Sequence, residues 1–204
     1  MTKRIIANNP IVGVRKPPKT SRGRRALISE AEHHTLVAHA DADFGDFLAL
    51  LWHTGSRPSE IANLTLDDVD FTNAVAILSK HKTQHLGKER IVILNADALA
   101  ILRRRIAFAQ QSNTRLFFVS ETGEAMTAKG IGGRMRRTCE RAGIRRCIAY
   151  GCRHTYATEA LSKGVPEATV AALLGHSNTT MLHKHYSHLT AKMGVLREAS
   201  AKIR

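Results

Sequence analysis

The sequence predicts an α+β domain that is mostly helical, with one small antiparallel sheet between two groups of helices. Three observations support this fold class. Apolar residues recur with a helical period through most of the chain after Leu27, while β-branched residues gather in two short runs at 74–78 and 90–94. Glycines stand where several helices are expected to end. Its 204 residues are enough for one domain with a full core, or for a domain plus an arm, and the sequence contains no internal repeat.

Helix-start signals mark the first three helices. Ser29 and Glu32 stand at capping-box spacing in "ISEAEHHTLVAHA". The apolar segment "DFGDFLALLWHTG" follows, and Gly55 is expected to end its helix. "SRPSEIANL" then begins a short third helix, with Pro58 in the first turn.

The apolar period then changes from helical to extended. "AVAIL" (74–78) and "RIVIL" (90–94) flank a polar loop, which predicts a β-hairpin. A helix through "DALAILRRRIAFAQ" and a short strand at "LFFVS" (116–120) come next. The remaining chain is predicted to be helical at 127–142, 151–163, 166–174, 178–188 and in the terminal "KMGVLREASAKI", with Gly143 and Gly164 ending the first two.

The two ends of the chain differ from its middle. Residues 1–26 are predicted to form a basic linker or arm, since "NNPIVGVRKPPKTSRGRR" combines prolines and charges without an apolar period. This arm is either a disordered, tag-like segment or a basic strap that lies along a phosphate backbone. The folded domain is expected over 27–190, followed by a C-terminal helix or tail at 191–204.

The charge balance points to a polyanionic partner. The chain has 31 Lys and Arg against 17 Asp and Glu, a formal net charge of +14. Clustered basic side chains that neutralise phosphates release condensed counterions, so nucleic acid is favoured over a merely solvated cationic surface. Aromatic residues, at 5%, are too few for a base-stacking platform that binds single strands.

Other classes of protein are disfavoured by what the sequence lacks. It contains no apolar run of about 18 residues and no signal peptide, so we expect a cytoplasmic protein without a membrane partner. Cys139, Cys147 and Cys152 are odd in number and form no Cys-x-x-Cys pair. This pattern favours a reducing compartment over a zinc ribbon or a disulfide scaffold, and we expect the three to be buried or neutral.

Two of four stretches that concentrate unusual polar residues lie in the first half of the chain. In "HTGSRPSEIANLTLDDVDF" (53–71), Arg57 stands where a glycine turn enters a helix, an arrangement suited to an anion. A plain surface arginine is the alternative. In the hairpin loop "SKHKTQHLGKER" (79–90), a lysine could donate a proton to a leaving oxygen, or the loop could simply be solvated.

The other two stretches lie near the end. "YGCRHTYATEAL" (150–161) puts Tyr150 three residues before Arg153 on one helical face. "LLGHSNTTMLHKHYSHL" (173–189) places Tyr186 among four histidines, which leaves open a metal site, an ordinary helix or a nucleophilic tyrosine. The metal site is disfavoured, because the three histidines of the expected helix, His183, His185 and His188, include no i,i+4 pair.

Together these stretches resemble the catalytic domain of the tyrosine recombinases, the phage integrase family. "TGSRPSEIANLTLDDVDF" is similar to the family's first box, "RHTYATEAL" to its second and "LLGHSNTTMLHKHYSHL" to its last, in the family's order. The resemblance covers most of the chain. It implies the integrase catalytic-domain fold over 27–190 and a DNA strand-transferring enzyme that forms a 3′-phosphotyrosine bond without hydrolysis, metal or other cofactor.

The resemblance implies a role for each matching residue. Arg57 and Arg153 would grip the non-bridging oxygens of the scissile phosphate, a task suited to planar, permanently charged donors. His176 would donate to the same phosphate. Glu60 resembles the family's acidic position and would hold Arg57 in place, although ordinary helix-start electrostatics explains it equally well.

The nucleophile and the acid follow from the same resemblance. Tyr186 would attack phosphorus, and a hairpin lysine would protonate the departing 5′ oxygen. Lys82 fits the family pattern better, with Lys80 as the alternative because the loop is longer than usual. The covalent intermediate conserves the bond energy, so strands can be rejoined without ATP.

The chain departs from the family at Tyr150. The second box usually reads His-x-x-Arg, and the residue three before Arg153 is a tyrosine, a poor base at pH 7. We expect Tyr150 in the site, with His154 as a supporting residue or a stand-in base. Tyr186 also lies ten residues after His176, one more than in the commonest pattern.

Three functions follow as alternatives. The leading one is a site-specific recombinase acting on double-stranded DNA, bacterial or phage-encoded, a monomer when free and a homo-tetramer on DNA, with no small-molecule substrate. The others are a DNA-binding protein of the same fold that cuts weakly or not at all, and a swivelling type IB topoisomerase. Family members usually carry an N-terminal clamp domain, so we expect either a catalytic-domain fragment or a minimal protein.

Overall fold

A computed structural model of the chain describes residues 26–78 and 90–175. The helices in these residues are α1 (Glu30–His39), α2 (Ala42–Thr54), α3 (Pro58–Ala62), α4 (Ala96–Gln111), α5 (Ala128–Ala142), α6 (Tyr150–Ser162) and α7 (Glu167–Leu174). The strands are β1 (Val69–Asp70), β2 (Val75–Leu78) and β3 (Arg90–Ile93), and a short 3-10 helix, η2 (Leu66–Asp68), precedes the first strand. The predicted class, a mostly helical α+β fold with one small antiparallel sheet, is confirmed.

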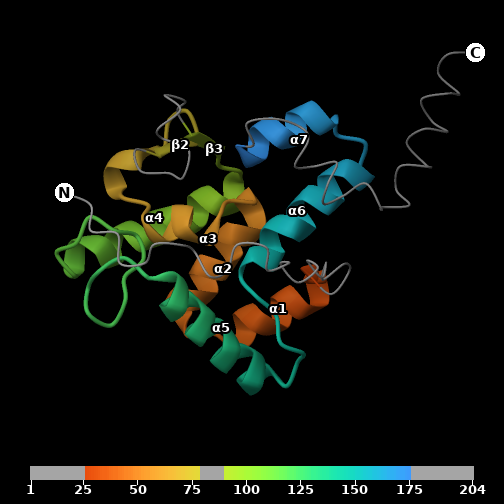
Figure 1. Ribbon diagram of the computed structural model, residues 1–204. Helices are drawn as coiled ribbons and strands as arrows, with labels where there is room; N and C mark the ends of the chain where they lie inside the picture. The colour runs from red at the N-terminus through yellow and green to blue at the C-terminus, as the bar shows by residue number, and fades with distance from the viewer. Residues whose placement is uncertain (1–25, 79–89, 176–204) are drawn as a thin grey trace, which may run out of the picture.

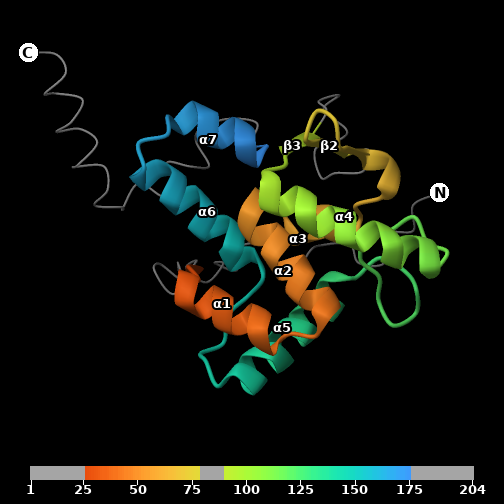
Figure 2. The same cartoon turned by 180° about the vertical axis from the view of Figure 1, so that it is seen from behind.

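Helix α2 runs through the middle of the molecule and packs against α1, α4 and α6 (Figure 1). Helices α1 and α5 pack together at one end, while the sheet and α7 lie at the other, as the reverse view also shows (Figure 2). Helix α7 contacts both β3 and α6. The end with the sheet is therefore where elements from the middle and the end of the chain meet.

Local capping explains where the helices begin. Ser29 and Glu32 form the predicted capping box: the Ser29 N–H donates to Glu32 Oε2 at 2.8 Å, and the Glu32 N–H donates to Ser29 Oγ at 3.2 Å. Asp41 accepts from the Phe44 N–H and begins α2, and Asn95 begins α4 in the same way. These side chains satisfy backbone donors that a helix start leaves unpaired.

The predicted hairpin is present, and it belongs to a sheet of order β1-β2-β3. Strands β2 and β3 are antiparallel, with Ile77 opposite Ile91 and Leu78 opposite Arg90. Strand β1 adds two residues beside β2, a pairing too short for the hydrophobic pattern to predict. Side chains of β3 alternate between buried and exposed, so Arg90 lies on the buried face of its strand.

The predicted strand at 116–120 is wrong. Only isolated bridges form there among the described residues, between Leu116 and Thr65 and between Val119 and Ala125. Phe117 and Phe118 are fully buried in the core, and the Phe118 ring meets Phe47 edge-on at 5.5 Å between centroids. The apolar run reflects burial in the core rather than strand pairing, two causes that short apolar segments do not distinguish.

The core has a large part and a small part. The large part surrounds α2 and takes in the sheet, α4 and α5, and it includes Cys139, Cys147 and Cys152, which are buried free thiols as predicted. The small part joins α6 to α7 through Ala157, Val170, Ala171 and Leu174. This second cluster fixes the end of α7 relative to α6.

Some predictions fall on residues outside the described ones. They are the predicted helices at 178–188 and at the C-terminus, and nearly all of the predicted arm at 1–26. Among the described helices, none is both long enough and apolar enough to span a bilayer.

Candidate active site

The turn between α2 and α3 carries the first predicted site residue. Gly55 ends α2 with φ of 62°, and Arg57 is the N-cap residue of α3, followed by Pro58 in the first turn. A Cβ on Gly55 would lie 2.6 Å from the Tyr156 ring of α6, so glycine serves both the left-handed turn and the close approach of α6. The turn therefore brings Arg57 close to α6.

Glu60 pairs with the Arg57 side chain and also caps the start of α3. Arg57 Nη1 lies 2.5 Å from Glu60 Oε1, and the Arg57 backbone N–H donates to Glu60 Oε2 at 2.8 Å. Glu60 is only 3% exposed. Burial raises the pKa of Glu60, but Arg90, the Arg57 N–H and the Arg57 guanidinium lower it more, so its pKa lies below the ordinary glutamate value. The carboxylate is charged at neutral pH.

Among the predicted site residues that the structure describes, Arg153 of α6 is the most buried, with 2% of its surface exposed. Its Nη1 donates to the Gly55 carbonyl at 2.9 Å and its Nη2 to the Leu174 carbonyl at 2.7 Å. Burial, and then the charge of Arg57, lower the pKa of Arg153 to about 10, against opposing effects of Tyr150 and Glu60. Arg153 therefore stays charged at pH 7 and joins the α2–α3 turn to the end of α7.

A third arginine, Arg90, lies in the same place and was not among the predicted site residues. Its Nη1 donates to the carbonyls of Ile91 at 2.7 Å and Leu173 at 2.9 Å, and its Nε lies 3.5 Å from Glu60 Oε1. A usable signal was present in "RIVIL". Strand alternation puts Arg90 and Val92 on one face, and a charged residue on a core-facing position needs a partner.

The three arginines meet at the end of α7. The carbonyls of Leu173, Leu174 and Gly175 accept hydrogen bonds from Arg90, Arg153 and Arg57, the last at a longer 3.4 Å. Carbonyls at a helix end lack helical partners and carry the negative end of the helix dipole, so cations are stabilised there. We call these three side chains with Glu60 the arginine cluster. In the described residues it holds three guanidinium groups against one carboxylate.

Tyr150 and His154 lie on the same helix as Arg153. Tyr150 is the first residue of α6 and is 37% exposed, and its ring lies 5.1 Å from the His154 ring in an edge-on arrangement. Tyr150 and Arg153 stand three residues apart on α6, the spacing at which side chains share one face of a helix. The structure therefore brings Tyr150 and His154 to the edge of the arginine cluster.

Four predicted residues lie outside the described ones: Lys82 and its alternative Lys80, His176 and Tyr186. Two segments outside the described residues, 79–89 and 176–204, adjoin Arg90 and Gly175 in sequence. His176 directly follows Gly175, and the segment with the two lysines ends where Arg90 begins β3. Among the predicted residues that are described, Arg57, Glu60 and Arg153 come together, with Tyr150 and His154 beside them.

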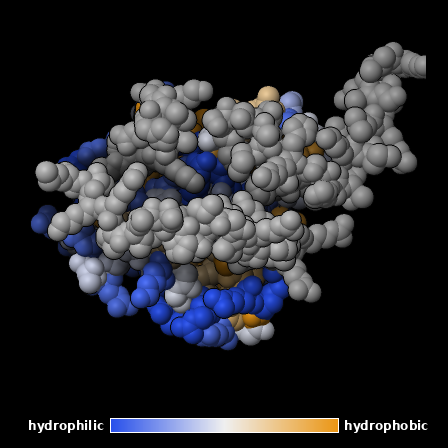
Figure 3. All heavy atoms as spheres, in the orientation of Figure 1, coloured by the Kyte–Doolittle hydropathy of each residue, from blue (hydrophilic) through white to orange (hydrophobic). Residues whose placement is uncertain are grey.

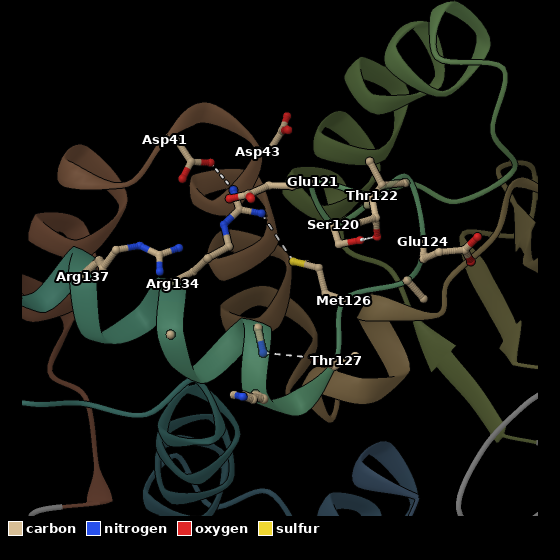
Figure 4. A pocket seen from close by; sticks show the side chains of 15 residues that line it. Asp41, Asp43, Ser120, Glu121, Thr122, Glu124, Met126, Thr127, Arg134 and Arg137 are labelled. Atoms are coloured by element: carbon tan, nitrogen blue, oxygen red, sulfur yellow. Dashed lines mark hydrogen bonds and ion pairs between the residues drawn. The ribbon is translucent and has the colours of Figure 1, made fainter.

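A separate hollow lies between the start of α2, the start of α5 and the segment 119–127 (Figure 4). Arg134 pairs there with Asp41 and contacts the Met126 sulfur at 3.4 Å. None of the predicted site residues that the structure describes lines this hollow. Nor do the described residues contain a group of three or more His, Cys, Asp or Glu placed to hold a metal ion.

Comparison with known proteins decides the family. A sequence model described as the phage integrase family matches residues 25–193. The chain belongs to the phage integrase family. Tyrosine recombinase XerC 2 of Ralstonia nicotianae is 33% identical to this integrase-family chain, and the match covers 91% of the chain and 57% of the relative.

Solved structures agree with this assignment. The XerA recombinase crystal structure has a TM-score of 0.70 and 26% identity, over 93% of this integrase-family chain and 67% of that one. The Tn1549 transposon integrase in complex with circular intermediate DNA has a TM-score of 0.73 over 87% of this chain and 67% of that one, and at 22% identity it shows the shared fold alone.

The integrase-family chain is shorter than its relatives. It spans 57% of the Ralstonia recombinase and 60% of tyrosine recombinase XerD of Corynebacterium glutamicum. The match covers the tyrosine recombinase catalytic domain, which is also the part that contains the arginine cluster.

Proposed function

We propose that this chain is the catalytic part of a site-specific recombinase that cleaves and rejoins double-stranded DNA through a 3′-phosphotyrosine intermediate. The observation that carries the proposal is the arginine cluster: three guanidinium groups and one carboxylate meet beside the residue that precedes His176. Family membership supplies the reaction class, and the net charge of +14 suits a DNA backbone.

Arg57 and Arg153 bind the scissile phosphate in this proposal. Each guanidinium has five N–H donors, and the contacts described for Arg153 use two nitrogens on backbone carbonyls, which fixes its plane. Donors fixed in advance stabilise charge that develops on phosphate oxygens without reorganisation during the reaction. Together with His176, they supply the charge stabilisation for which many phosphoryl transfers use Mg²⁺, so the proposed reaction needs neither metal nor ATP.

In the proposed reaction one bond to phosphorus forms, another breaks, and two protons are transferred. The Tyr186 oxygen attacks phosphorus, the bond to the 5′ oxygen breaks, and Lys82 or Lys80 gives its proton to that oxygen. The Tyr186 proton goes to a base beside it, and Tyr150 stands where the family usually has a histidine. Attack by the free 5′ hydroxyl of another strand reverses these steps and releases Tyr186.

We place the reaction on DNA in the bacterial cytoplasm, with a monomer when free and a homo-tetramer on DNA. A similar solved structure supports a DNA substrate, since the Tn1549 transposon integrase is in complex with circular intermediate DNA. The hydrophilic surface over α5, at the bottom of Figure 3, is consistent with a polyanionic partner. Lys129, Arg136, Arg137 and Arg141 are exposed on that helix.

The test is a covalent adduct. Duplexes with a nick and randomised arms are incubated with the chain, and protein–DNA adducts are resolved on a denaturing gel with and without EDTA. We expect wild type to form an adduct in both conditions and Tyr186→Phe to form none. Tyr156→Phe is the matched control, because this half-buried tyrosine packs on Gly55, and it should keep the adduct. Equal adduct from Tyr186→Phe and wild type would contradict the assignment.

A second candidate rests on Tyr150, which stands where the family's usual histidine would be. It is a DNA-binding protein of the same fold that no longer cuts. This candidate predicts salt-sensitive DNA binding with no adduct in any condition, so the same gel, combined with a binding assay, separates the two.

A further inference from the structure

We propose that Arg90 is a positioning residue of the proposed active site. It fixes the orientation of Glu60, and through Glu60 that of Arg57, relative to the turn before His176. This inference rests on the proposed function, since it assigns a role within the same reaction. Arg90 is not a residue that touches DNA in this proposal. It acts through its three neighbours in the arginine cluster.

The first support is where the contacts of Arg90 come from. The side chain is 4% exposed and starts from the first residue of β3. It reaches Glu60 of α3 at 3.5 Å and the Leu173 carbonyl of α7 at 2.9 Å. One guanidinium therefore ties together three elements that lie far apart in the sequence.

The second support is a backbone shaped to receive this side chain. A Cβ on Gly175 would lie 2.6 Å from Arg90 Cδ, 2.7 Å from Nε and 3.0 Å from Cζ. Gly175 also has φ of 63°, which other residues adopt at a cost. The glycine before His176 is therefore needed for the Arg90 contact as well as for the turn.

The third support is the sharing of one carboxylate. Glu60 Oε1 lies against Arg57 Nη1 and Arg90 Nε, while Oε2 accepts the Arg57 backbone N–H. With both oxygens held, the carboxylate has one orientation and so has Arg57. Without Arg90, Glu60 would pair with Arg57 alone, and the guanidinium would be drawn away from a bound phosphate.

The fourth support is a surplus of donors. Nη2 of Arg90 is buried and makes no hydrogen bond with the described residues, and Nε has only the longer 3.5 Å contact with Glu60 Oε1. Burial lowers the pKa of Arg90, and Glu60 opposes this effect. A buried cation with spare donors costs stability. A functional role in fixing the geometry of the arginine cluster would explain why a buried arginine stands at this position despite its cost to folding stability.

The experiment compares Arg90→Lys and Arg90→Met with wild type in single-turnover cleavage at saturating DNA. The probe is a duplex that forms the adduct with wild type, used with its natural phosphodiester and with a neutral methylphosphonate at the scissile position. Arg105→Lys is the matched control. Arg105 is also a buried arginine paired with a carboxylate, Asp43, but it lies outside the arginine cluster.

We expect Arg90→Lys to slow cleavage of the phosphodiester by about tenfold to a hundredfold and Arg90→Met by more, the range found when a preorganised donor is lost. DNA affinity should stay within about twofold, because in this proposal Arg90 contacts Glu60 and backbone carbonyls and makes no DNA contact. On the methylphosphonate, each rate relative to wild type should recover to within about fivefold, because oriented guanidinium charge matters less to a neutral phosphate. The cleavage rate of Arg105→Lys relative to wild type should be the same on both probes.

Three results would overturn the proposal. One is phosphodiester cleavage by Arg90→Lys or Arg90→Met at the wild-type rate. Another is an equal loss on both probes, which would assign Arg90 to folding alone, as would unfolding of both variants where Arg105→Lys stays folded. The third is the absence of any adduct from wild type, which would remove the proposed function and this inference together, whereas the first two leave the proposed function intact.

Discussion

At the scale of single residues, the arginine cluster consists of guanidinium groups that donate hydrogen bonds to backbone carbonyls. Arg153 donates from two nitrogens to the carbonyls of Gly55 and Leu174, and Arg90 donates to the carbonyls of Leu173 and Ile91. Lysine cannot make such paired contacts, because its charge is a single point on a flexible stem. The fold around the arginine cluster therefore requires this residue type, and the proposed phosphate chemistry would require it too.

Tyr150→His should increase cleavage. Tyr150 is partly exposed at the start of α6 and lies beside Arg153 and His154, so a histidine there would offer a base that titrates near neutral pH. General bases contribute about 10²- to 10⁴-fold, and we expect a gain of about tenfold in adduct formation at pH 7.5. Tyr150→Phe is the control and should bring no gain. If Tyr150→His is no faster than wild type, Tyr150 does not limit the reaction.

His33 should make the fold sensitive to acid. Its ring is 5% exposed and stacks on Trp52 at 4.2 Å, and burial lowers its pKa from 6.5 to about 4. The unfolded chain therefore binds the proton more tightly. The contribution of His33 to the free energy of unfolding is fully present above about pH 6.5 and is lost as the pH falls towards 4. We expect the free energy of unfolding to decrease by about 2 kcal/mol between pH 7 and pH 5 from this cause.

Urea unfolding at pH 7 and pH 5 measures this effect. In His33→Leu the difference between the two pH values should shrink by about 2 kcal/mol relative to wild type. His34→Leu, an exposed neighbour on the same helix, should leave the difference unchanged. An identical pH response in His33→Leu and wild type would show that His33 does not titrate in this way.

At the scale of elements, helix α5 offers a matched pair of glycines. Both Gly132 and Gly143 are exposed, and a Cβ on either would meet nothing within 4 Å. They differ in backbone conformation, because Gly132 lies inside the helix and Gly143 ends it with φ of 63°. Gly132→Ala should therefore stabilise the fold by about 0.5–1 kcal/mol, and Gly143→Ala should destabilise it by about 1 kcal/mol.

Thermal unfolding of the two variants at equal ionic strength provides the measurement. Opposite shifts of the melting temperature are expected, since the substitution is the same and only the backbone angle differs. Shifts of the same sign would mean that α5 does not have the helical boundaries described.

Elements with local signals were predictable from the sequence. The capping box of Ser29 and Glu32 begins α1, and Gly55 and Gly143 end α2 and α5 where expected. Elements that depend on distant partners were not. The segment 116–120 is apolar because Phe117 and Phe118 fill the core, and β1 exists only because β2 lies beside it.

The same distinction applies to the site. Arg57, Glu60 and Arg153 stand in short motifs, and the structure brings them together. Arg90 has no motif around it in this sequence. Its place depends on strand alternation and on the turn at Gly175, about 85 residues later in the chain. Candidate catalytic residues in short motifs are therefore easier to predict from the sequence than residues that position them through distant contacts.

At the scale of the whole molecule, the fold gathers short segments from most of the chain at one end. The turn before α3, the start of β3, the first turns of α6 and the end of α7 all contribute to the arginine cluster. Helix α2 and the small core between α6 and α7 keep these segments in place. The central claim is that this arrangement serves a covalent transfer through Tyr186.

Binding to duplex DNA should depend steeply on salt. With a net charge of +14, we expect several phosphate contacts, each of which releases counterions. Between 50 and 200 mM NaCl the affinity for a short duplex should fall by about a hundredfold or more, as fluorescence anisotropy would measure. A fall of less than about threefold would mean that the basic residues do not contact phosphates.

The most direct test of the central claim is mass spectrometry of the adduct after protease and nuclease digestion. We predict a peptide that contains Tyr186 joined through phosphate to the 3′ oxygen of a nucleotide, with a free 5′ hydroxyl on the released strand. A nucleotide attached to another residue, or a linkage to the 5′ oxygen, would contradict the claim.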